Sequence, residues 1–140
     1  MHVTLTLAKL NLPGSSITLR RATRDDLPTI VDLLVEDPLG RTHEAPIQAD
    51  DLVIATMQLS FIPGLARHGA LRAQAEAVRV AANYRSRGLG AAMFHWAIDE
   101  ARRRGCALVQ LTTNKTRTDA RRFYERLGFT ASHEGFKLNL

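Results

Sequence analysis

The stretch from residue 85 to residue 90 reads R-S-R-G-L-G and combines the residue types of an anion-binding turn. It follows an alternating apolar run that ends at Val80 and precedes a long amphipathic segment, so we expect it to connect a strand to a helix. Glycine lets the backbone approach a ligand closely, and the first N–H groups of a helix have no internal acceptor. The stretch therefore predicts a site where a phosphate binds at a helix N-terminus.

The spacing of the glycines narrows the kind of phosphate ligand. No Lys-Ser or Lys-Thr pair follows Gly90, which excludes the Walker pattern of nucleoside triphosphate sites. Residues 91–93 are Ala, Ala and Met, which excludes the G-x-G-x-x-G pattern of dinucleotide sites. The pattern that fits is R-x-x-G-x-G.

A second motif, R-F-Y-E-R-L-G-F at residues 122–129, lies further along the chain. In this order the two motifs resemble the GNAT N-acetyltransferase superfamily, in which the first is the acyl-CoA pyrophosphate loop. The second resembles the superfamily's C-terminal helix, which carries a tyrosine and ends at Gly-Phe. The resemblance is close over residues 76–138 and looser in the N-terminal half. It implies that acetyl-CoA is the acyl donor, and we expect no metal.

The resemblance also assigns the residues that hold the acyl donor. The N–H groups of residues 85–91 are expected to bind the CoA pyrophosphate, and the backbone of Val78 and Val80 to pair with the pantetheine arm. Asn114 is expected beside that arm, although Asn-Lys-Thr is also ordinary turn composition. The full set assigned to the cofactor is Val78, Val80, Arg85, Ser86, Arg87, Gly88, Leu89, Gly90, Ala91, Asn114, Arg121 and Phe123.

Acetyl transfer to an amine needs a base for the amine and an acid for the leaving thiolate. We assign the base to Glu76, because it lies on the strand before the loop and alternation places it on one face with Val78 and Val80. The alternative for Glu76 is a surface or ion-paired glutamate. The resemblance assigns the acid to Tyr124, near the CoA sulfur, and the alternative is a core aromatic residue.

Three other side chains could enter this chemistry. His68 and His133 are rival bases, although each is more simply explained as a loop histidine. Cys106 could carry an acyl group, but no base stands beside it in the sequence, which favours a buried bystander. We therefore expect direct attack by the amine in a ternary complex.

The acceptor is not specified by these residues. The segment 111–124, followed by Ser132-His133, also resembles aminoalkylphosphonate and other small-amine acetyltransferases. A primary amine of a small molecule is the first expectation, and a protein lysine or N-terminus is the second. A non-catalytic CoA-binding or interaction domain is an alternative of a different class.

The N-terminal half contains one strand and one helix that the pattern predicts clearly. Residues 17–22 alternate as a strand, so we expect an N-terminal extension over 1–16 and an acetyltransferase domain over 17–140. Thr23 caps a helix whose apolar residues continue at helical spacing to Val35.

Residues 36–50 depart from the family's plan. They contain Pro38, Gly40 and Pro46 and are too few for the usual second helix and strand. At most a stub of strand fits at 45–49. This shortening puts the acceptor pocket in doubt more than the cofactor site.

The C-terminal half alternates between strands and helices. Its expected strands are 52–62, 71–80, 107–113 and 130–138, and its expected helices are 88–104 and 118–127. A strand, a helix and a strand in this order imply a right-handed crossover between parallel neighbours. The predicted fold is α/β: a single domain with a mixed, mostly antiparallel sheet, a β-α-β crossover and helices on both faces.

Composition restricts the cellular compartment and the kinds of partner that we expect for the protein. Its 140 residues suit one domain, and its single cysteine excludes an internal disulfide. No signal peptide or apolar run of membrane-spanning length is present, so we expect a cytoplasmic protein that does not bind membranes. The net charge is +5, but the arginines lie on helix faces and around the two motifs, so we expect no nucleic-acid partner.

The shortened region also predicts an assembly. A missing strand or covering helix leaves a sheet edge and apolar side chains exposed, and symmetric dimers commonly cover such surfaces. We therefore expect a homodimer, with residues 1–12 ordered against a sheet edge. The side chains expected to be exposed are Val3, Leu5, Leu7, Leu52, Ile54 and Met57.

Overall fold

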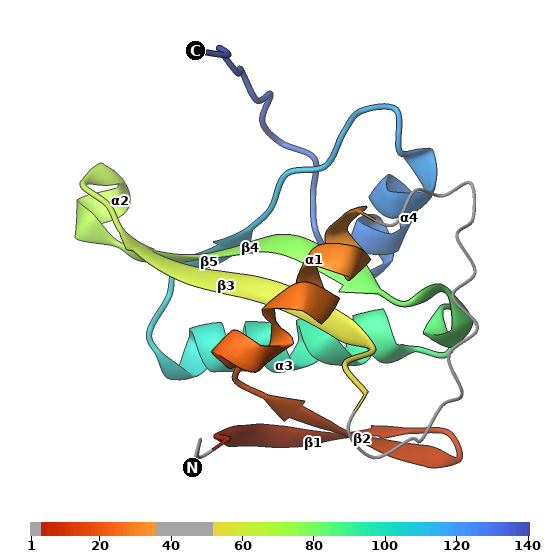
Figure 1. Cartoon of the computed structure of the whole chain (residues 1–140). Coiled ribbons are helices and arrows are strands. Elements are labelled where there is room, and N and C mark those ends of the chain that lie inside the picture. Colours follow the sequence, from red (N-terminus) through yellow and green to blue (C-terminus); the bar gives the residue numbers. More distant parts are fainter. Residues whose placement is uncertain (1–3, 36–51) are drawn as a thin grey trace.

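The computed structural model describes residues 4–35 and 52–140, and the strands within them form two sheets (Figure 1). The first is an antiparallel hairpin of β1 (Thr6–Leu12) and β2 (Ser15–Arg20). The second has the order β3-β4-β5, with β3 (Ala55–Pro63), β4 (Leu71–Val80) and β5 (Leu108–Gln110). The helices are α1 (Leu27–Val35), α2 (Ala66–Gly69), α3 (Leu89–Arg103) and α4 (Thr118–Arg126).

The second sheet has mixed strand directions. β3 and β4 are antiparallel, whereas β4 and β5 are parallel because α3 crosses over between them. Figure 1 shows α1 in front of this sheet and α3 behind it. The predicted α/β fold class is thus confirmed, while the expectations for residues 36–50 lie outside the described residues. No helix in the described ranges is long and apolar enough to cross a lipid bilayer.

A Pro-Gly turn closes the N-terminal hairpin. Leu12 pairs with Ser15, so Pro13 and Gly14 are the two turn residues, and Gly14 has a φ of 77°. Proline followed by glycine with positive φ is the signature of a type II turn. The boundary predicted after residue 16 falls inside this hairpin, and the division into extension and domain stays a prediction.

The hairpin supplies part of the hydrophobic core. Leu10 is buried against Leu89 and Met93 of α3, and Ile54 and Met57 pack against the same cluster. The expectation that Ile54 and Met57 are exposed is therefore wrong, because residues of the hairpin and α3 cover them. Other predicted positions, Leu5, Leu7 and Leu52, are exposed, and Val3 lies outside the described residues.

An ion pair joins β2 to the start of α1. Arg20 donates from Nη1 and Nη2 to the two carboxylate oxygens of Asp26, both at 2.7 Å, and the Thr23 backbone N–H donates to Oδ2 at 2.7 Å. These donors hold the pKa of the Asp26 carboxyl well below its usual range, although burial opposes the shift. The bidentate geometry fixes the hairpin to the helix that covers the front of the sheet.

A β-bulge interrupts β4 near its C-terminal end. Gln58 pairs with Glu76 and Thr56 pairs with Arg79, so a single residue of β3 lies opposite both Ala77 and Val78. Ala77 has a φ of 51°, a left-handed conformation that usually requires glycine. The bulge bends β4 where it approaches the loop at residues 85–90.

The C-terminal segment is not the strand that the sequence predicts. Residues 130–140 have no strand partner among the described residues and are exposed throughout. Figure 1 shows the segment projecting away from the body of the molecule. The interruption at Gly135 and the short β5, which ends at Gln110 rather than Thr113, leave it no paired neighbour.

Candidate active site

The candidate site lies where β4 and β5 separate. Arg72 pairs with Leu108 and Gln74 with Gln110, and no later pair joins the two strands within the described residues. The Ala81 N–H donates to the Ile54 carbonyl on the β3 side at 2.8 Å. Backbone groups of successive strand residues point to opposite edges, so those of Val80 point toward the side that β5 has left.

Arginine side chains donate hydrogen bonds to two backbone carbonyls at this open edge. The Val80 carbonyl accepts a hydrogen bond from Arg85 Nε at 2.9 Å. The Val78 carbonyl accepts one from Arg79 Nη1 at 2.8 Å. The strand edge therefore offers main-chain acceptors that an extended, amide-bearing ligand can take over from the two side chains.

The loop after β4 places a helix N-terminus beside this edge. Gly88 is the N-cap of α3 with a φ of 83°, and the Ala92 N–H donates to its carbonyl at 3.0 Å. The N–H groups of Leu89, Gly90 and Ala91 precede that first helical bond, so they have no acceptor inside the helix. They form the helix N-terminus at which the sequence predicts that an anion binds.

The two glycines of the loop have different roles. Gly88 supplies the positive φ, whereas Gly90 lies at the contact between α3 and α4, where a Cβ would be 3.4 Å from Cζ of Phe123, an ordinary van der Waals distance. Phe123, which was assigned to the cofactor, is thus also a packing residue of the helix contact.

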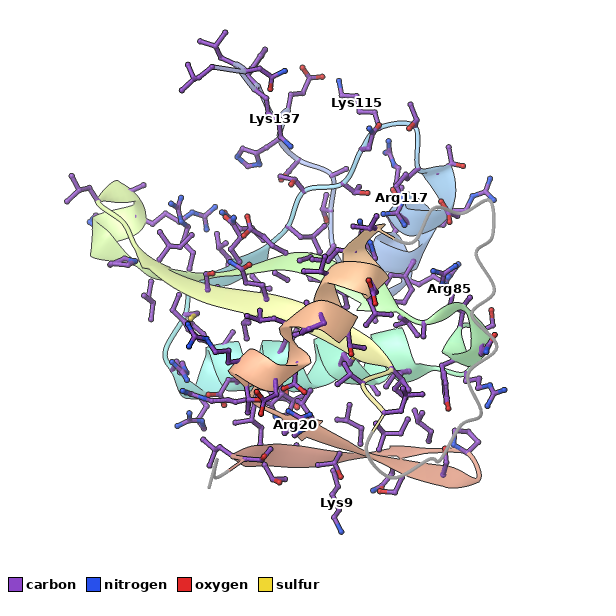
Figure 2. All side chains as sticks on the ribbon, viewed as in Figure 1. Lys9, Arg20, Arg85, Lys115, Arg117 and Lys137 are labelled. Atoms are coloured by element: carbon purple, nitrogen blue, oxygen red, sulfur yellow. The ribbon has the colours of Figure 1, made fainter. Side chains whose placement is uncertain are left out.

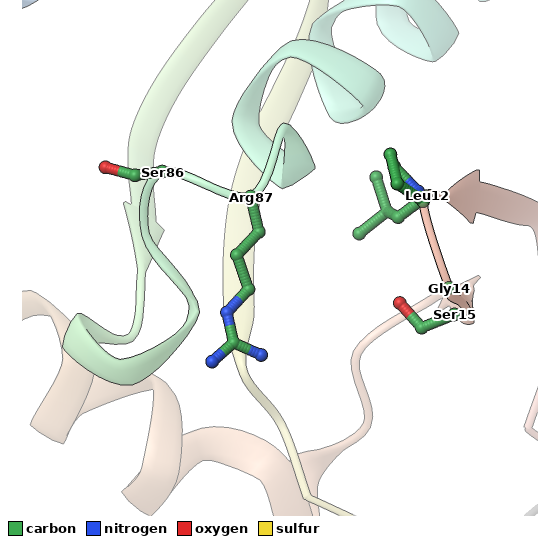
Figure 3. Close-up of a pocket in the computed structure, with 6 residues that line it drawn as sticks. Leu12, Gly14, Ser15, Ser86 and Arg87 are labelled. Carbon is green, nitrogen blue, oxygen red and sulfur yellow. The ribbon is translucent and has the colours of Figure 1, made fainter.

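Arg87 faces a cleft of about 510 Å³ between the loop and the turn of the N-terminal hairpin. Its guanidinium carbon lies 5.5 Å from the centroid of the Tyr84 ring. Figure 3 shows the Arg87 side chain running downward between the loop and the hairpin, while the Ser86 hydroxyl points away from the hairpin. The cleft is lined by Leu12, Pro13, Gly14, Ser15, Ser86 and Arg87.

Tyr124 of α4 lies in an aromatic cluster that also contains Phe94 of α3. Its ring centroid is 5.5 Å from that of Phe94 in α3, 5.4 Å from that of Phe123 and 6.1 Å from that of Phe129, all edge to face. Burial raises the pKa of the Tyr124 hydroxyl above its ordinary value, and the positive charges of Arg117 and Arg79 oppose the rise. The hydroxyl is protonated at neutral pH, as it is at the ordinary tyrosine value of 10.0, and burial makes it hold its proton more tightly.

Glu76 is held by a ladder of amide side chains across the sheet. Gln110 Nε2 donates to Gln74 Oε1 at 2.7 Å, and Gln74 Nε2 donates in turn to Glu76 Oε1. Gln58 Nε2 donates to Glu76 Oε2 at 3.3 Å from the opposite strand. Both carboxylate oxygens thus have a donor, and neither donor is a cation. Glu76 is exposed, which agrees with the alternative of a surface glutamate, and the bonds that the structure gives this side chain include no ion pair.

Because of the bulge, Glu76 and Val80 lie on opposite faces of β4. Paired residues lie on one face, so Glu76 with Gln58 and Arg79 with Thr56 point the same way. Val80 pairs with Ala55, which neighbours Thr56, and therefore points the opposite way. The expectation that Glu76 shares a face with Val80 is wrong, because simple alternation does not register the extra residue of the bulge.

The remaining predicted residues take local partners. Asn114 Oδ1 accepts hydrogen bonds from the backbone N–H of Thr116 at 3.0 Å and from its hydroxyl at 2.9 Å, which is a turn role. Arg121 Nε donates to Glu125 Oε1 at 2.9 Å on the exposed face of α4. Their contacts with a cofactor stay predictions.

Among the described residues, the structure gives the rival bases and the rival nucleophile no bond to Glu76 or Tyr124. His68 lies in α2, which Figure 1 places at the end of β4 opposite to α4. His133 lies in the exposed C-terminal segment, with its Nδ1 2.7 Å from the Ser132 hydroxyl. Cys106 is half-buried at the start of the segment that leads into β5.

Sequence reasoning missed the arginines that act on Tyr124 and the amides that hold Glu76. Figure 2 shows Arg85 and Arg117 on the side of the molecule that carries α4. The available signals were a basic residue directly before a helix and two glutamines within apolar strands. These residues are Arg79, Arg117, Gln58 and Gln74.

Comparisons with known proteins agree with the fold and the motifs. The sequence matches the acetyltransferase (GNAT) family over residues 16–129. The aminoalkylphosphonate N-acetyltransferase of Salmonella typhimurium is 44% identical over 52 residues, which are 37% of this chain and 34% of that protein. The match therefore spans about a third of that curated relative.

Solved structures give broader similarity. A transcriptional regulator from Bacillus halodurans C-125 is 38% identical, covering 86% of this chain and 97% of that chain with a TM-score of 0.74. An acetyltransferase from Trypanosoma brucei is 30% identical, covering 66% of this chain and 63% of that chain with a TM-score of 0.58. The predicted family is confirmed, and the chain belongs to the GNAT family of acetyltransferases, whose acyl donor is acetyl-CoA.

Proposed function

We propose that this protein is an N-acetyltransferase that moves the acetyl group of acetyl-CoA to a primary amine of a small molecule. It acts in the cytoplasm as a homodimer, by direct attack in a ternary complex. The observation that carries the proposal is the separation of β4 from β5, which leaves main-chain acceptors on β4 just before the loop that leads to the N-terminus of α3.

Different residues of the chain bind different parts of acetyl-CoA. The N–H groups of Leu89, Gly90 and Ala91 hold the pyrophosphate, with Arg85 and Arg87 adding positive charge. The pantetheine arm pairs with β4 at Val78 and Val80, where its amides replace the hydrogen bonds from Arg79 and Arg85. Holding the thioester and the amine side by side supplies several kcal/mol of the rate enhancement.

Two residues carry out the proton transfers of the reaction. Glu76 takes a proton from the amine, directly or through one water, and the amine nitrogen then bonds to the acyl carbon as the C–S bond breaks. Tyr124 donates its proton to the departing sulfur, since a thiol has a pKa of about 8.5 and leaves more readily when protonated. The products are an acetamide and a free thiol.

The nature of the acceptor rests on a relative. The matching segment of the Salmonella protein belongs to an enzyme named for an aminoalkylphosphonate. Incubation of the full chain with acetyl-CoA and a panel of small primary amines, including aminoalkylphosphonates, is expected to release CoA in proportion to the amine. Peptides with a free lysine or a free N-terminus test the alternative acceptors. Turnover that is confined to peptides would overturn the small-molecule proposal.

Replacing Glu76 by Gln is expected to lower kcat/KM for the amine by roughly 100-fold, because the base is lost while the side-chain volume stays. The acetyl-CoA affinity should not change. Gln74→Leu removes one donor to the carboxylate and is expected to give a smaller loss in the same direction. Asp99→Asn, which neutralises an exposed carboxylate on α3, is the matched control and should keep full activity.

Comparing turnover with cofactor binding separates a base from a merely structural glutamate. With Glu76 as the base, Glu76→Gln lowers the turnover of the amine and leaves the binding of acetyl-CoA unchanged. A variant that keeps the wild-type rate would assign the base to another residue, and His133→Ala would then be the next variant to measure.

A second candidate is a non-catalytic domain that binds acetyl-CoA and reports its level to a partner. The observation that favours it is the match over most of the chain to a protein described as a transcriptional regulator. Calorimetric binding of acetyl-CoA without turnover of any amine would support this candidate over the enzyme.

A further inference from the structure

The bulge in β4 brings two opposite charges to one face of the strand. Glu76 pairs with Gln58 and Arg79 pairs with Thr56, and these two residues of β3 are two positions apart. Residues two positions apart on a strand share a face and lie about 7 Å from each other. In a regular strand, residues three positions apart, as Glu76 and Arg79 are, would lie on opposite faces. The bulge therefore places a carboxylate and a guanidinium side by side on one surface.

This surface is the face of the sheet that α1 covers in part. Ala55 and Val80 pack against the core cluster that contains Met93 of α3. Glu76 and Arg79 point to the other face, on the side where Figure 1 shows α1. Glu76 is exposed and Arg79 is half-buried, so neither side chain is closed off from a small molecule.

The two charges do not neutralise each other. The Glu76 carboxylate accepts hydrogen bonds from the neutral amides of Gln74 and Gln58. Arg79 donates from Nη1 to the Val78 carbonyl at 2.8 Å, and within the described part of the chain it forms no ion pair with an acid. A guanidinium has five N–H donors in a planar fork that matches a carboxylate or a phosphate. Arg79 therefore has donors left for an anionic group.

A second cation adds positive charge on the same side of the site. The charges of Arg79 and Arg117 both act to lower the pKa of the Tyr124 hydroxyl, against the larger effect of burial. Arg117 is exposed directly before α4, as Figure 2 shows, and has no ion pair with any other described residue. An anion is thus attracted toward these two arginines, whereas a protonated amine is attracted toward Glu76.

We propose that Arg79 determines specificity by binding an anionic group of the acceptor, which is therefore a zwitterion. Its primary amine lies at Glu76, and its carboxylate, phosphate or phosphonate lies at Arg79, with a few carbon atoms between them. When acetyl-CoA binds, the pantetheine arm takes over the Val78 carbonyl and frees Nη1 of Arg79 for the acceptor. The inference rests on the proposed function, because it names the substrate class of the same site.

The first test compares three primary amines of similar length in the wild-type protein. β-Alanine carries a carboxylate, aminoethylphosphonate carries a phosphonate, and propylamine carries no anion. We expect kcat/KM for at least one zwitterion to exceed that for propylamine by roughly 10- to 100-fold, the range of one hydrogen bond to a charged group. The faster of the two zwitterions identifies the preferred anion. Equal values for all three amines would overturn the proposal.

The second test assigns this preference to one side chain. Arg79→Gln should lower kcat/KM for the preferred zwitterion by the same factor and leave that for propylamine unchanged. Arg79→Lys keeps the positive charge and should restore part of the loss. Arg102→Gln removes an exposed arginine of α3 and should keep the wild-type preference. An equal loss for the zwitterion and for propylamine in Arg79→Gln would show that Arg79 is only structural.

The third test measures binding without turnover. Titration calorimetry of β-alanine and of aminoethylphosphonate into the full chain saturated with CoA should show binding that is at least roughly tenfold weaker in Arg79→Gln. Binding that depends on Arg79, without acetylation of any amine, would remove the proposed reaction and keep the anion site. Acetylation and binding that are both independent of Arg79 would remove the anion site and keep the reaction.

Discussion

Gly88→Glu is expected to weaken acetyl-CoA binding by roughly 100-fold, the equivalent of losing about one hydrogen bond to a charged group. The new side chain fills the space beside the N–H groups of Leu89, Gly90 and Ala91, and its charge repels the pyrophosphate. Titration calorimetry with acetyl-CoA measures the effect directly.

The substitution also strains the backbone, since Gly88 has a φ of 83°. Gly105→Glu controls for this strain, because Gly105 has a φ of 75° and follows the opposite end of the same helix. A Cβ at Gly105 would meet no atom within 4 Å, so this variant should bind acetyl-CoA like the wild type. Equal affinity in Gly88→Glu and Gly105→Glu would remove the loop from the cofactor site.

Tyr124→Phe is expected to lower kcat by roughly tenfold or more, because it removes the general acid and nothing else. The ring contacts with Phe94, Phe123 and Phe129 remain, so the melting temperature should change little. Because burial raises the pKa of Tyr124, the wild-type kcat should decline only at alkaline pH, as the hydroxyl loses its proton. That alkaline limb should be missing in the variant.

Two further variants test the specificity of this effect. Tyr84→Phe removes a hydroxyl from the other tyrosine, whose ring lies beneath Arg87, and should keep the wild-type kcat. Cys106→Ala should stay active, since no acyl-enzyme is expected. Wild-type turnover in Tyr124→Phe would leave that residue a packing role only, and a folded but inactive Cys106→Ala would revive the acyl-enzyme route.

The features that the sequence predicted well depend on short-range patterns. The helix expected at 88–104 is α3 at Leu89–Arg103, because a wide apolar stripe at helical spacing has few competing explanations. The loop glycines were placed correctly because positive φ and helix N-caps have strong residue preferences. Tyr124 was assigned through its motif rather than through any physical pattern, and its catalytic role stays a prediction.

The features that were missed depend on pairing between distant segments. Period-two alternation cannot reveal the bulge at Ala77, because a small apolar residue fits either face. The hairpin of residues 6–20 had its signal in Pro13-Gly14, which was interpreted as a break between two segments instead of a turn within one. The segment 130–138 has strand composition, but a strand also needs a neighbour, and composition does not supply one.

The bulge has a consequence for how this fold can change over generations. Removing Ala77 would leave Glu76, Arg79 and Val80 opposite their present partners on β3 and would produce an unbroken ladder. It would also eliminate a left-handed alanine that costs about 1–2 kcal/mol. The shorter chain would be the more regular and the more stable one, but a straight β4 could pair with its parallel neighbour to the end. Selection for stability alone would thus delete the residue, and the proposed pairing of a ligand with β4 would account for its retention.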